Sequence, residues 1–553
     1  MTNLAQLLQR HLATPEKPLY TQFVDGAWRH FSAAEVAALA ARWQQAFRRE
    51  GLEAGDRVAI CLRNGVNWVA ADQAALGLGL VVVPLYVDDN GDNLAWCLID
   101  SGARLLVLES ARLLPALQRS LSAMPTVVCL QETPPVPAVP LQAWLPEVAQ
   151  PFETAGLEPD RLATLVYTSG TTGRPKGVML SHRNLLANLE AVAETVAAYD
   201  SDVFLSLLPL SHMLERTGGY YFPLYCGSRV AFCRGISHLA EDLAAQRPTV
   251  IIAVPRVFER VLVRVEQALA RAPVKRLLFH LAVASGWRRF CGRENLFDRL
   301  LGRRLQGLVA GPILARLGGR MRVAVVGGAA LDKRVARTFI GLGLPMLQGY
   351  GLTETAPVIS VNRLADNDPE SVGPPLPNVE ARVNEQHELL VRGPSVMPGY
   401  WRNPDATGAV LDGDGWLNTG DQAEIRGGLV YIRGRTKDIL VLSNGEKVAP
   451  EDAEHAILED PLFEQAMLVG EGRAYLILLA VTGETDEKKL VRHANACLKD
   501  FPRWMRVRRV IALQEPWTLE DGLVTPTLKV KRRAVFGKFA ERIEQAYRSV
   551  RTV

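Results

Sequence analysis

The stretch Thr164–Asn188 constrains the fold of this chain more than any other. Leu165–Tyr167 is an apolar run typical of a strand, and it ends in Thr168–Gly177, a segment of glycines and hydroxyl residues with one arginine and one lysine. Glycines let the backbone curl and present successive N–H groups, while hydroxyls and cations add further donors. This junction predicts a polyphosphate site, followed by a short strand and a helix with Ser181 as N-cap.

Two other interpretations of this loop are less favourable. A Walker-type P-loop needs Gly-Lys-Ser/Thr after four spacer residues. Counting from Gly170, those positions hold Pro175, Lys176 and Gly177, so no hydroxyl residue follows the lysine to hold magnesium. A plain surface loop is disfavoured because this one leaves a strand and carries placed cations.

The segment YTSGTTGRPKGVMLSH, residues 167–182, resembles the phosphate-loop signature of the AMP-forming adenylating superfamily. That superfamily includes acyl-CoA synthetases, firefly-luciferase-like enzymes and peptide-synthetase adenylation domains. The resemblance covers essentially the whole chain, with the motifs in the expected order. It implies that the loop holds the phosphates of ATP through Thr168, Ser169, Gly170, Thr171, Thr172, Gly173 and Lys176.

Length and composition are those of an ordinary globular protein with two or more domains: 553 residues, 48% hydrophobic and 22% charged. The net charge of +4 gives no reason to expect a nucleic acid partner. Seven scattered cysteines without a CxxC pair predict reduced thiols in a cytoplasmic protein, with no metal cluster. Neither a signal peptide nor a transmembrane run of about 18 apolar residues is expected.

Residues 55–135 alternate strand and helix signals. Apolar runs predict strands at 57–62, 81–86, 104–109 and 126–130, with helices at 67–76 and 111–122. This rhythm indicates βαβ units and a mostly parallel sheet. The proline-rich stretch 134–151 predicts a loop that leads into the phosphate strand.

Further strands are expected at the start of 203–216, at 229–233, at the start of 249–261 and at 323–331, with another strand and turn within 344–362 and a helix at about 182–198. Residues 260–320 are predicted to be helical and are rich in arginine. The simplest interpretation is solvated arginines on surface helices, and a basic face that rests on anionic lipid stays open as the alternative.

We expect an α/β fold with a large N-terminal domain of layered α/β sheets, a small β subdomain and a small α+β C-terminal domain. Short alternating runs after Val372 indicate an antiparallel subdomain over about 372–434. The polar segment Arg433–Asp438 then suggests a boundary, which divides the chain into an adenylate-forming domain, 1–434, and a C-terminal domain, 435–553. The resemblance implies that the C-terminal domain is mobile and swings about Lys437.

Two glycine-rich strand ends suit a nucleotide, since glycine lets a flat ring approach the backbone. Tyr350 can stack on that ring, and Thr353 can donate to a phosphate oxygen. Glu354 is a hard oxygen ligand for Mg²⁺ or, alternatively, a helix-start carboxylate. The resemblance implies that Glu354 holds the metal with Thr168. It also implies that AMP is bound by Gly328, Ala329, Gln348, Gly349, Tyr350, Gly351 and Thr353.

Asp421 follows Thr-Gly in a predicted turn. A carboxylate can accept both ribose hydroxyls, although turn aspartates are common for structural reasons. The resemblance implies that Asp421 and Arg435 contact the ribose.

Lys529 lies in TPTLKVKRR near the C-terminus, where a basic cluster is normally a solvated face. The resemblance aligns Lys529 with the catalytic lysine, although many relatives have glycine where this chain has Leu528. Lys531 is the alternative. The form TPTLKVKR is similar to the long-chain acyl branch of the family.

His212 follows Pro209-Leu210-Ser211, and LPLSHMLER resembles the long-chain fatty acid ligase form of the family's second motif. A lone histidine is more often structural, so His212 is expected at the substrate site without a proven role as a base. The resemblance suggests an acyl tunnel and a CoA contact formed by His212, Gly218, Gly219, Val326, Gly327 and Lys447.

The implied activity is that of an AMP-forming long-chain fatty acid–CoA ligase. ATP and Mg²⁺ would convert the acid to acyl-AMP and pyrophosphate, and CoA would then take the acyl group and release AMP. Two alternatives stay open: an acyl-AMP ligase that loads a carrier protein, and a non-catalytic nucleotide- or lipid-binding relative. Acyl length, a homodimer and peripheral contact with the inner face of the membrane also stay open.

Overall fold

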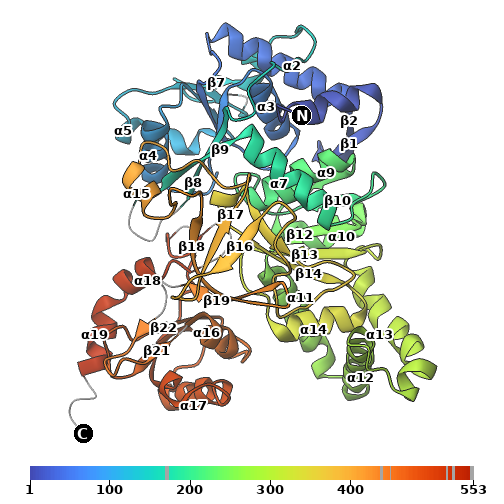
Figure 1. Cartoon of the computed structure of the whole chain (residues 1–553), viewed down its shortest axis with the longest axis vertical. Helices are drawn as coiled ribbons and strands as arrows, with labels where there is room; N and C mark the ends of the chain where they lie inside the picture. The colour runs from blue at the N-terminus through green and yellow to red at the C-terminus, as the bar shows by residue number, and fades with distance from the viewer. Residues whose placement is uncertain are drawn as a thin grey trace.

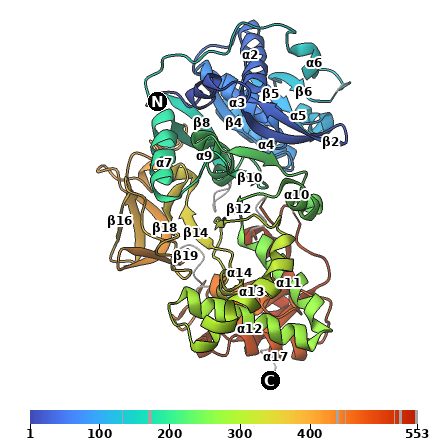
Figure 2. The same cartoon turned by 90° about the vertical axis from the view of Figure 1, so that its right-hand side faces the viewer.

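The computed structural model describes residues 1–131, 133–168, 174–435, 440–448, 450–518, 521–525 and 530–548. Over these residues the strands form sheets of eight, seven, four, three and two strands, with helices packed around them. Figures 1 and 2 show the large sheets at the N-terminal end and in the centre, and the C-terminal region beneath them. The mixed α/β class predicted from the sequence, with a large N-terminal part and a smaller C-terminal part, is confirmed.

The seven-stranded sheet carries the predicted phosphate hairpin at one edge, in the order β7-β6-β5-β3-β4-β8-β9. Its strands are β3 (Arg57–Cys61), β4 (Val81–Pro84), β5 (Leu105–Leu108), β6 (Thr126–Cys129), β7 (Val139–Pro140), β8 (Leu162–Thr168) and β9 (Lys176–Ser181). Strands β3 to β6 pair in parallel, as the βαβ pattern predicted, while β8 and β9 pair antiparallel. The connecting helices include α3 (Val66–Gly77), α4 (Gly91–Ser101) and α5 (Leu114–Ser120).

Two details of this region differ from the prediction. The expected helix over 111–122 is a 3₁₀ turn followed by α5, which starts with Pro115 in its first turn, where proline is tolerated. The expected loop over 134–151 contains β7 and the short helix α6 (Leu141–Trp144). Strand β7 forms because Val139 and Pro140 pair at the edge next to β6, a position where proline costs no sheet hydrogen bond.

The eight-stranded sheet has the order β15-β14-β13-β12-β10-β11-β1-β2. Its strands are β1 (Pro18–Val24), β2 (Ala27–Ser32), β10 (Val203–Ser206), β11 (Arg229–Phe232), β12 (Val250–Ala253), β13 (Val323–Val326), β14 (Met346–Gly351) and β15 (Val358–Val361). The interior strands are parallel, and β2 and β15 form antiparallel edges. The largest apolar cluster includes side chains of both large sheets, so the sheets share a core.

Helix α7 (His182–Thr195) follows the phosphate hairpin and confirms Ser181 as its N-cap. The Ser181 hydroxyl accepts from the N–H of Asn184, and the Asn184 side chain accepts from the N–H of Ser181. This reciprocal cap satisfies two backbone donors at the helix start. The phosphate hairpin is thereby followed directly by a fixed helix.

Residues 255–320 are largely helical, as predicted, and connect β12 to β13. They form α11 (Pro255–Ala270), α12 (Pro273–Phe290), the π-helical turn η5 (Asp298–Gly302) and α13 (Arg303–Ala315). Helix α12 packs closely on α14 (Lys333–Leu342). The two helices are so near each other that a Cβ at Gly286 would overlap the carbonyl oxygen of Gly341. No helix in the described part of the chain is both long and apolar enough to cross a membrane.

The predicted small β subdomain is a four-stranded antiparallel sheet. It consists of β16 (Glu380–Val383), β17 (Glu388–Arg392), β18 (Leu417–Arg426) and β19 (Leu429–Arg435), in that order. In Figures 1 and 2 it lies against the large sheets. Its last strand carries the chain towards the C-terminal region.

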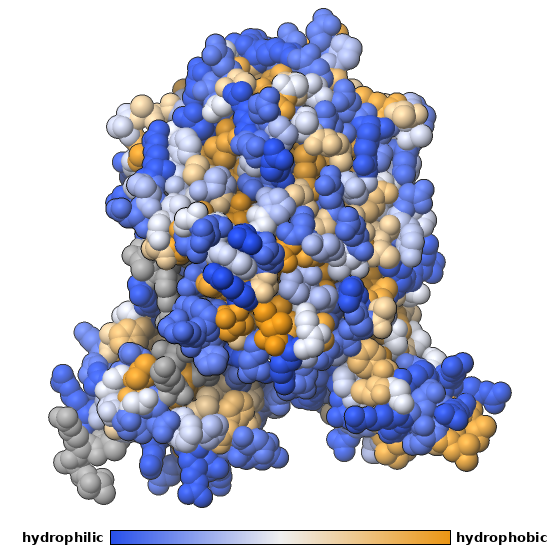
Figure 3. Space-filling view, viewed as in Figure 1, coloured by the Kyte–Doolittle hydropathy of each residue, from blue (hydrophilic) through white to orange (hydrophobic). Residues whose placement is uncertain are grey.

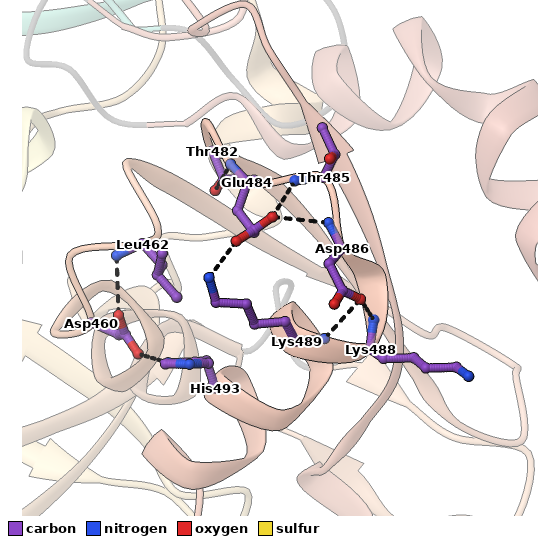
Figure 4. Close-up of polar contacts among 9 residues, drawn as sticks. All are labelled: Asp460, Leu462, Thr482, Glu484, Thr485, Asp486, Lys488, Lys489 and His493. Carbon is purple, nitrogen blue, oxygen red and sulfur yellow. Dashed lines mark hydrogen bonds and ion pairs between the residues drawn. The ribbon is translucent and has the colours of Figure 1, made fainter.

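The C-terminal region has its own core on both faces of a three-stranded sheet. Its elements are β20 (Leu440–Val441), β21 (Lys447–Val448), α16 (Pro450–Leu458), β22 (Gln465–Val469), β23 (Leu476–Val481), α17 (Glu487–Cys497), β24 (Val507–Leu513), α18 (Arg532–Lys538) and α19 (Ala540–Arg548). Asp486 caps α17 by accepting from the N–H groups of Lys488 and Lys489 (Figure 4). The Lys489 ammonium and nearby backbone N–H groups lower the pKa of Glu484 to about 2.

Candidate functional site

A cavity of about 810 Å³ lies where the phosphate hairpin, the ends of β13 and β14, the β subdomain and the C-terminal region meet. Most of the described residues that the sequence assigned to a site line this cavity. They are Thr168, Lys176, His212, Gly218, Val326, Gly327, Gly328, Gly349, Tyr350, Gly351, Thr353, Glu354, Asp421 and Arg435. Residues up to 267 positions apart in the sequence therefore share one wall.

Three predicted residues do not line the cavity. Ala329 is exposed beyond the end of β13, Gln348 is buried within β14, and Gly219 packs against the Glu215 carboxylate. Ser169–Gly173, Lys437 and Lys529 lie outside the described residues, as does the side chain of Lys447. The roles assigned to all these residues stay predictions.

The stem of the phosphate hairpin is held from both sides. On one side, the Trp96 indole N–H donates to the carbonyl of Pro175 at 3.0 Å, and the Arg174 guanidinium lies 4.4 Å from the centre of the same ring. On the other, the backbone N–H of Trp401 donates to the carbonyl of Gly177 at 2.7 Å. These contacts fix the positions from which Thr168 and Lys176 face the cavity.

Tyr400 links the phosphate end of the cavity to the predicted metal carboxylate, and the sequence reasoning missed it. Its hydroxyl donates to Oε1 of Glu354 at 2.8 Å, and the Lys176 ammonium lies 5.0 Å from the centre of its ring. Glu354 itself sits in a short 3₁₀ turn after β14. In the sequence, the glycine before Tyr400 is the one hint of an unusual backbone turn. The structure shows such a turn, with a φ of 150° at Gly399.

The cavity brings together Tyr350, Asp421 and Arg435, of which Asp421 and Arg435 are the predicted ribose contacts. Asp421 and Arg435 face each other on β18 and β19, with 3.3 Å between Oδ1 and Nε. The Tyr350 hydroxyl donates to the other carboxylate oxygen of Asp421. Burial and the Asp421 charge hold the pKa of Tyr350 well above its usual range, so the hydroxyl remains a donor.

Glycines leave the space for a flat ring beside Tyr350. A Cβ at Gly351 would overlap the carbonyl oxygen of Pro357, and Gly328 has a φ of 81°. A Cβ at Gly327 would lie only 3.3 Å from the carbonyl oxygen of Gly349, on the neighbouring strand end. Side chains at these positions would therefore fill or distort the nucleotide wall.

His212 lines the cavity and also caps the short helix α8 (Met213–Glu215). Its Nδ1 accepts from the backbone N–H of Leu214 at 3.2 Å. Burial lowers the pKa of His212 to about 4, because a charged imidazole is poorly solvated there. The ring is therefore neutral at pH 7, with its hydrogen on Nε2, and can donate one hydrogen bond.

An apolar section of the cavity wall adjoins His212. It is formed by residues of α7 and its C-cap, α8, the π-helical turn η3 (Arg216–Tyr221), the start of α9 (Phe222–Cys226) and β12. They include Val192, Val196, Met213, Gly218, Phe222 and Ile252. The buried Arg216 holds this turn in place, since it pairs with Asp72 and donates to the Thr164 hydroxyl of β8 at 2.8 Å. The apolar wall and the phosphate hairpin are thus fixed relative to one another.

The C-terminal region reaches the same cavity through Gly522, Thr525 and Lys531. Thr525 and Lys531 stand on either side of residues 526–529. Two described residues close to Lys529 in the sequence, Thr525 and Lys531, therefore lie at the cavity wall.

The donor chemistry fits Mg²⁺ bound together with a polyphosphate. Within the described residues there is no cluster of three or more His, Cys, Asp or Glu side chains, so a cage made by the protein alone is not seen. Mg²⁺ commonly takes one or two carboxylates plus substrate phosphates and waters. Glu354, with one oxygen oriented by Tyr400, and the Thr168 hydroxyl provide such a partial set at the phosphate end.

Comparison with known proteins gives one consistent relationship. Residues 8–401 match the sequence model of the family described as AMP-binding enzyme, and residues 437–551 match that of the AMP-binding enzyme C-terminal domain. The chain is 32% identical to the long-chain-fatty-acid–CoA ligase FadD15 of Mycobacterium tuberculosis, over 98% of this chain and 96% of that protein.

Two further similarities bear on the acceptor and on the fold. The chain is 26% identical to the long-chain-fatty-acid–[acyl-carrier-protein] ligase AEE15 of Arabidopsis thaliana, over 90% of this chain and 80% of that protein. The crystal structure of ATP-bound MatB from Rhodopseudomonas palustris superimposes with a TM-score of 0.76 at 24% identity, covering 97% of this chain and 99% of that one.

Proposed function

The chain belongs to the AMP-binding enzyme family, and we propose that it is an AMP-forming long-chain fatty acid–CoA ligase. One observation carries the proposal: a single cavity is lined by the hairpin stem, the glycine-rich ends of β13 and β14, the Asp421 carboxylate and an apolar section. A nucleotide and an acyl chain can therefore meet at the centre of one site. The similarity to FadD15 over nearly the full length supports a long-chain acid as the substrate.

In the first step the fatty carboxylate attacks the α-phosphorus of ATP, and pyrophosphate leaves. Both reactants are anions, so the site must position them in line and offset their repulsion. Lys176 and residues 168–173 bind the β- and γ-phosphates, Tyr350 and the glycines hold adenine, and Asp421 with Arg435 binds the ribose. Glu354 and Thr168 would hold Mg²⁺, which supplies positive charge to the phosphates when bound.

We assign Lys529 as the cation that contacts the α-phosphate and the acyl carboxylate. One preorganised charge of this kind contributes roughly 3–4 kcal/mol to the stability of a transition state. Thr525 and Lys531 at the cavity wall support this assignment, because they bracket Lys529 in the sequence.

In the second step the CoA thiol loses its proton and attacks the acyl carbonyl, and AMP leaves. We propose that the C-terminal domain, 435–553, first rotates about Lys437 and withdraws Lys529, which admits the thiol near His212 and Lys447. The neutral His212 ring can donate a hydrogen bond to the acyl oxygen.

The acceptor is tested by measuring pyrophosphate and AMP release with ATP, Mg²⁺ and fatty acids of increasing length, with and without CoA. Turnover that needs both a long-chain acid and CoA supports the ligase. Release that stops at one equivalent with CoA present, and resumes with an acyl carrier protein, supports the activity named for AEE15. No release with any fatty acid would contradict both and leave either a different carboxylate substrate or a non-catalytic nucleotide- or lipid-binding protein.

We also propose a cytoplasmic location with peripheral contact at the inner face of the membrane. The cysteines of the chain are free thiols, and three of them are buried, as expected for a protein in a reducing compartment. A homodimer stays an expectation without a surface to support it.

A further inference from the structure

Residues 255–320 form a projecting unit, here called the helical arm, made of α11, α12, η5 and α13. Figures 1 and 2 show it beside the C-terminal region, at the end of the molecule opposite the N-terminal sheet. The arm is inserted between β12 and β13, whose residues Ile252 and Val326 line the cavity. It is therefore attached directly to the wall of the candidate site.

The arm contains the whole positive excess of the chain. It holds fourteen Lys and Arg residues against four Asp and Glu residues, a net charge of +10. The chain as a whole has 63 basic and 59 acidic residues, so the remainder has 49 against 55, a net charge of −6. A charge separation of this size predicts attraction to a polyanionic surface.

The acidic side chains of the arm do not neutralise its exposed surface. Glu294 and Asp298 pair with Arg289 and Arg288 inside the arm, and Glu266 pairs with Arg334 of α14. Several basic side chains are exposed and have no ion pair with any described residue. They are Arg264, Arg271, Lys275, Arg276, Arg293, Arg299, Arg303 and Arg304.

Aliphatic side chains project between these cations. Of the 23 large apolar residues exposed in the described chain, eleven lie in the arm. Val274, Leu277, Leu278 and Leu281 follow the i, i+3, i+4, i+7 spacing and so form one stripe on α12. The buried residues of α12, such as Phe279 and Val283, lie on the side that packs against the protein, so this stripe faces away from it.

Further leucines are exposed in the turn beyond α12 and in α13. Leu296, Leu300 and Leu308 are 73%, 67% and 77% exposed. Figure 3 shows apolar side chains among hydrophilic ones at the lower right of the molecule, where Figure 1 places these helices. Apolar groups gathered on a surface in this way mark an interaction site.

We propose that the helical arm docks on an anionic lipid bilayer, with its leucines in the acyl–headgroup boundary and its arginines on the lipid phosphates. The exposed charges are of one sign, and the exposed apolar groups are aliphatic apart from Phe290 and Phe297, which is the pattern of interfacial helices. A dimer joined arm to arm does not fit, because two arms of net charge +10 would repel each other. Long basic side chains can also extend their stems along the apolar layer while their charges reach the headgroups.

This proposal does not depend on the activity proposed above, although docking would place the cavity close to a bilayer that dissolves long-chain acids. The two ideas can therefore fail separately. Vesicle binding is measured without ATP, acid or CoA, and pyrophosphate release is measured in detergent without vesicles.

The test is flotation of the full-length protein with phosphatidylcholine vesicles that contain or lack phosphatidylglycerol. We expect binding only to the anionic vesicles, weakened by added salt. Each Lys or Arg near an anionic surface adds to the binding affinity. The double variant Lys275→Gln/Arg276→Gln should therefore bind roughly 30-fold more weakly. The matched control is Arg506→Gln/Arg508→Gln, which removes two exposed arginines of the C-terminal region and should bind like the wild type.

The apolar contribution has its own pair of variants. Leu300→Gln should weaken binding to anionic vesicles, whereas Val148→Gln, at a position 84% exposed outside the arm, should not. Thermal melting of all variants should match the wild type, because every substituted side chain is exposed. Equal loss with arm and control variants would overturn the proposal. So would no binding of the wild type, or capture of an acidic carrier protein by the same residues without vesicle binding.

Discussion

In the cavity, the charged side chains of Asp421 and Glu354 contact partners within the protein, whereas many basic side chains of the helical arm face solvent. Asp421 contacts Tyr350 and Arg435, and Glu354 accepts a hydrogen bond from Tyr400. The arm instead exposes basic side chains such as Lys275 and Arg276 without ion pairs among the described residues. Fixed charges suit a small ligand bound in one geometry, while unpaired mobile side chains suit a fluid surface.

The cavity and the arm should also respond differently to salt and to single substitutions. Contacts in the cavity are shielded from solvent, so ionic strength should affect nucleotide binding less than it affects docking of the arm. Cavity residues stand at specific positions in motifs, whereas the arm depends on the number and exposure of its cations. A single substitution should therefore be severe in the cavity and partial on the arm.

The largest effect expected is that of Lys529→Ala. Loss of one preorganised charge should slow acyl-AMP formation about 100- to 1,000-fold, which corresponds to roughly 3–4 kcal/mol. Thioester formation from supplied acyl-AMP should be largely kept, because the lysine is withdrawn in that step. The two half-reactions are measured separately by pyrophosphate release and by acyl-CoA formation.

Lys531→Ala is the matched control for this prediction, since Lys531 lines the cavity two residues later. It should affect acyl-AMP formation far less. A larger effect from Lys531→Ala, or equal loss of both half-reactions in Lys529→Ala, would show that the lysine is wrongly assigned.

The second effect compares two buried histidines, His182 outside the cavity and His212 on its wall. Burial lowers the pKa of both to about 4. The unfolded chain takes up protons near pH 6.5 and the folded chain does not, so stability falls as the pH drops from 6.5 towards 4. Between pH 7 and pH 5 His182 alone should cost about 2 kcal/mol, measured by urea unfolding.

His182→Asn provides the control, because its side-chain oxygen can still accept from the N–H of Leu4, as Nδ1 does now. The variant should lose about half of the acid sensitivity of unfolding that the two histidines produce. Its pH profile for kcat/KM should match the wild type, as His182 does not line the cavity. An unchanged acid sensitivity would contradict the lowered pKa.

Sequence patterns identified those features whose chemistry lies in consecutive residues. The strand before the phosphate loop, the Ser181 cap, the parallel pairing among β3 to β6 and the antiparallel strands after Val372 all depend on local signals, and the structure confirms them. Local patterns could not tell that β13 ends at Val326, which leaves Ala329 outside the cavity. Nor could they tell that Gly219 faces the Glu215 side chain instead of the acyl wall.

Local sequence patterns also could not predict contacts between distant segments of the chain. Trp96 holds the carbonyl of Pro175, 79 residues further along, and nothing near either residue indicates the pairing. Arg216 and Asp72 are fully buried charges that lie 144 residues apart in the sequence, and nothing near either residue indicates its partner. Their pairing depends on how η3 and α3 pack, which follows only from the complete fold.

The smallest effect expected concerns one such distant contact, between Tyr400 and Glu354. Tyr400→Phe removes the hydroxyl that donates to Oε1 of Glu354 at 2.8 Å and keeps the ring beside Lys176. A hydrogen bond to a carboxylate contributes about 1.5–3 kcal/mol at most, and a magnesium ion can replace part of it. We therefore expect a loss of about threefold to tenfold in kcat/KM for ATP, together with a higher Mg²⁺ requirement.

The matched control is Tyr431→Phe, which removes an equivalent bond from a tyrosine hydroxyl to the Asp368 carboxylate, also at 2.8 Å. Asp368 and Tyr431 do not line the cavity, so this variant should lower stability slightly and leave the Mg²⁺ dependence unchanged. If both variants changed the Mg²⁺ dependence equally, Tyr400 would act only through stability. If only Tyr400→Phe changed the Mg²⁺ dependence, the hydroxyl would orient the carboxylate that the metal needs. A single hydrogen bond would then fix a charge in the cavity, whereas basic side chains of the arm such as Lys275 and Arg276 have no ion pair among the described residues.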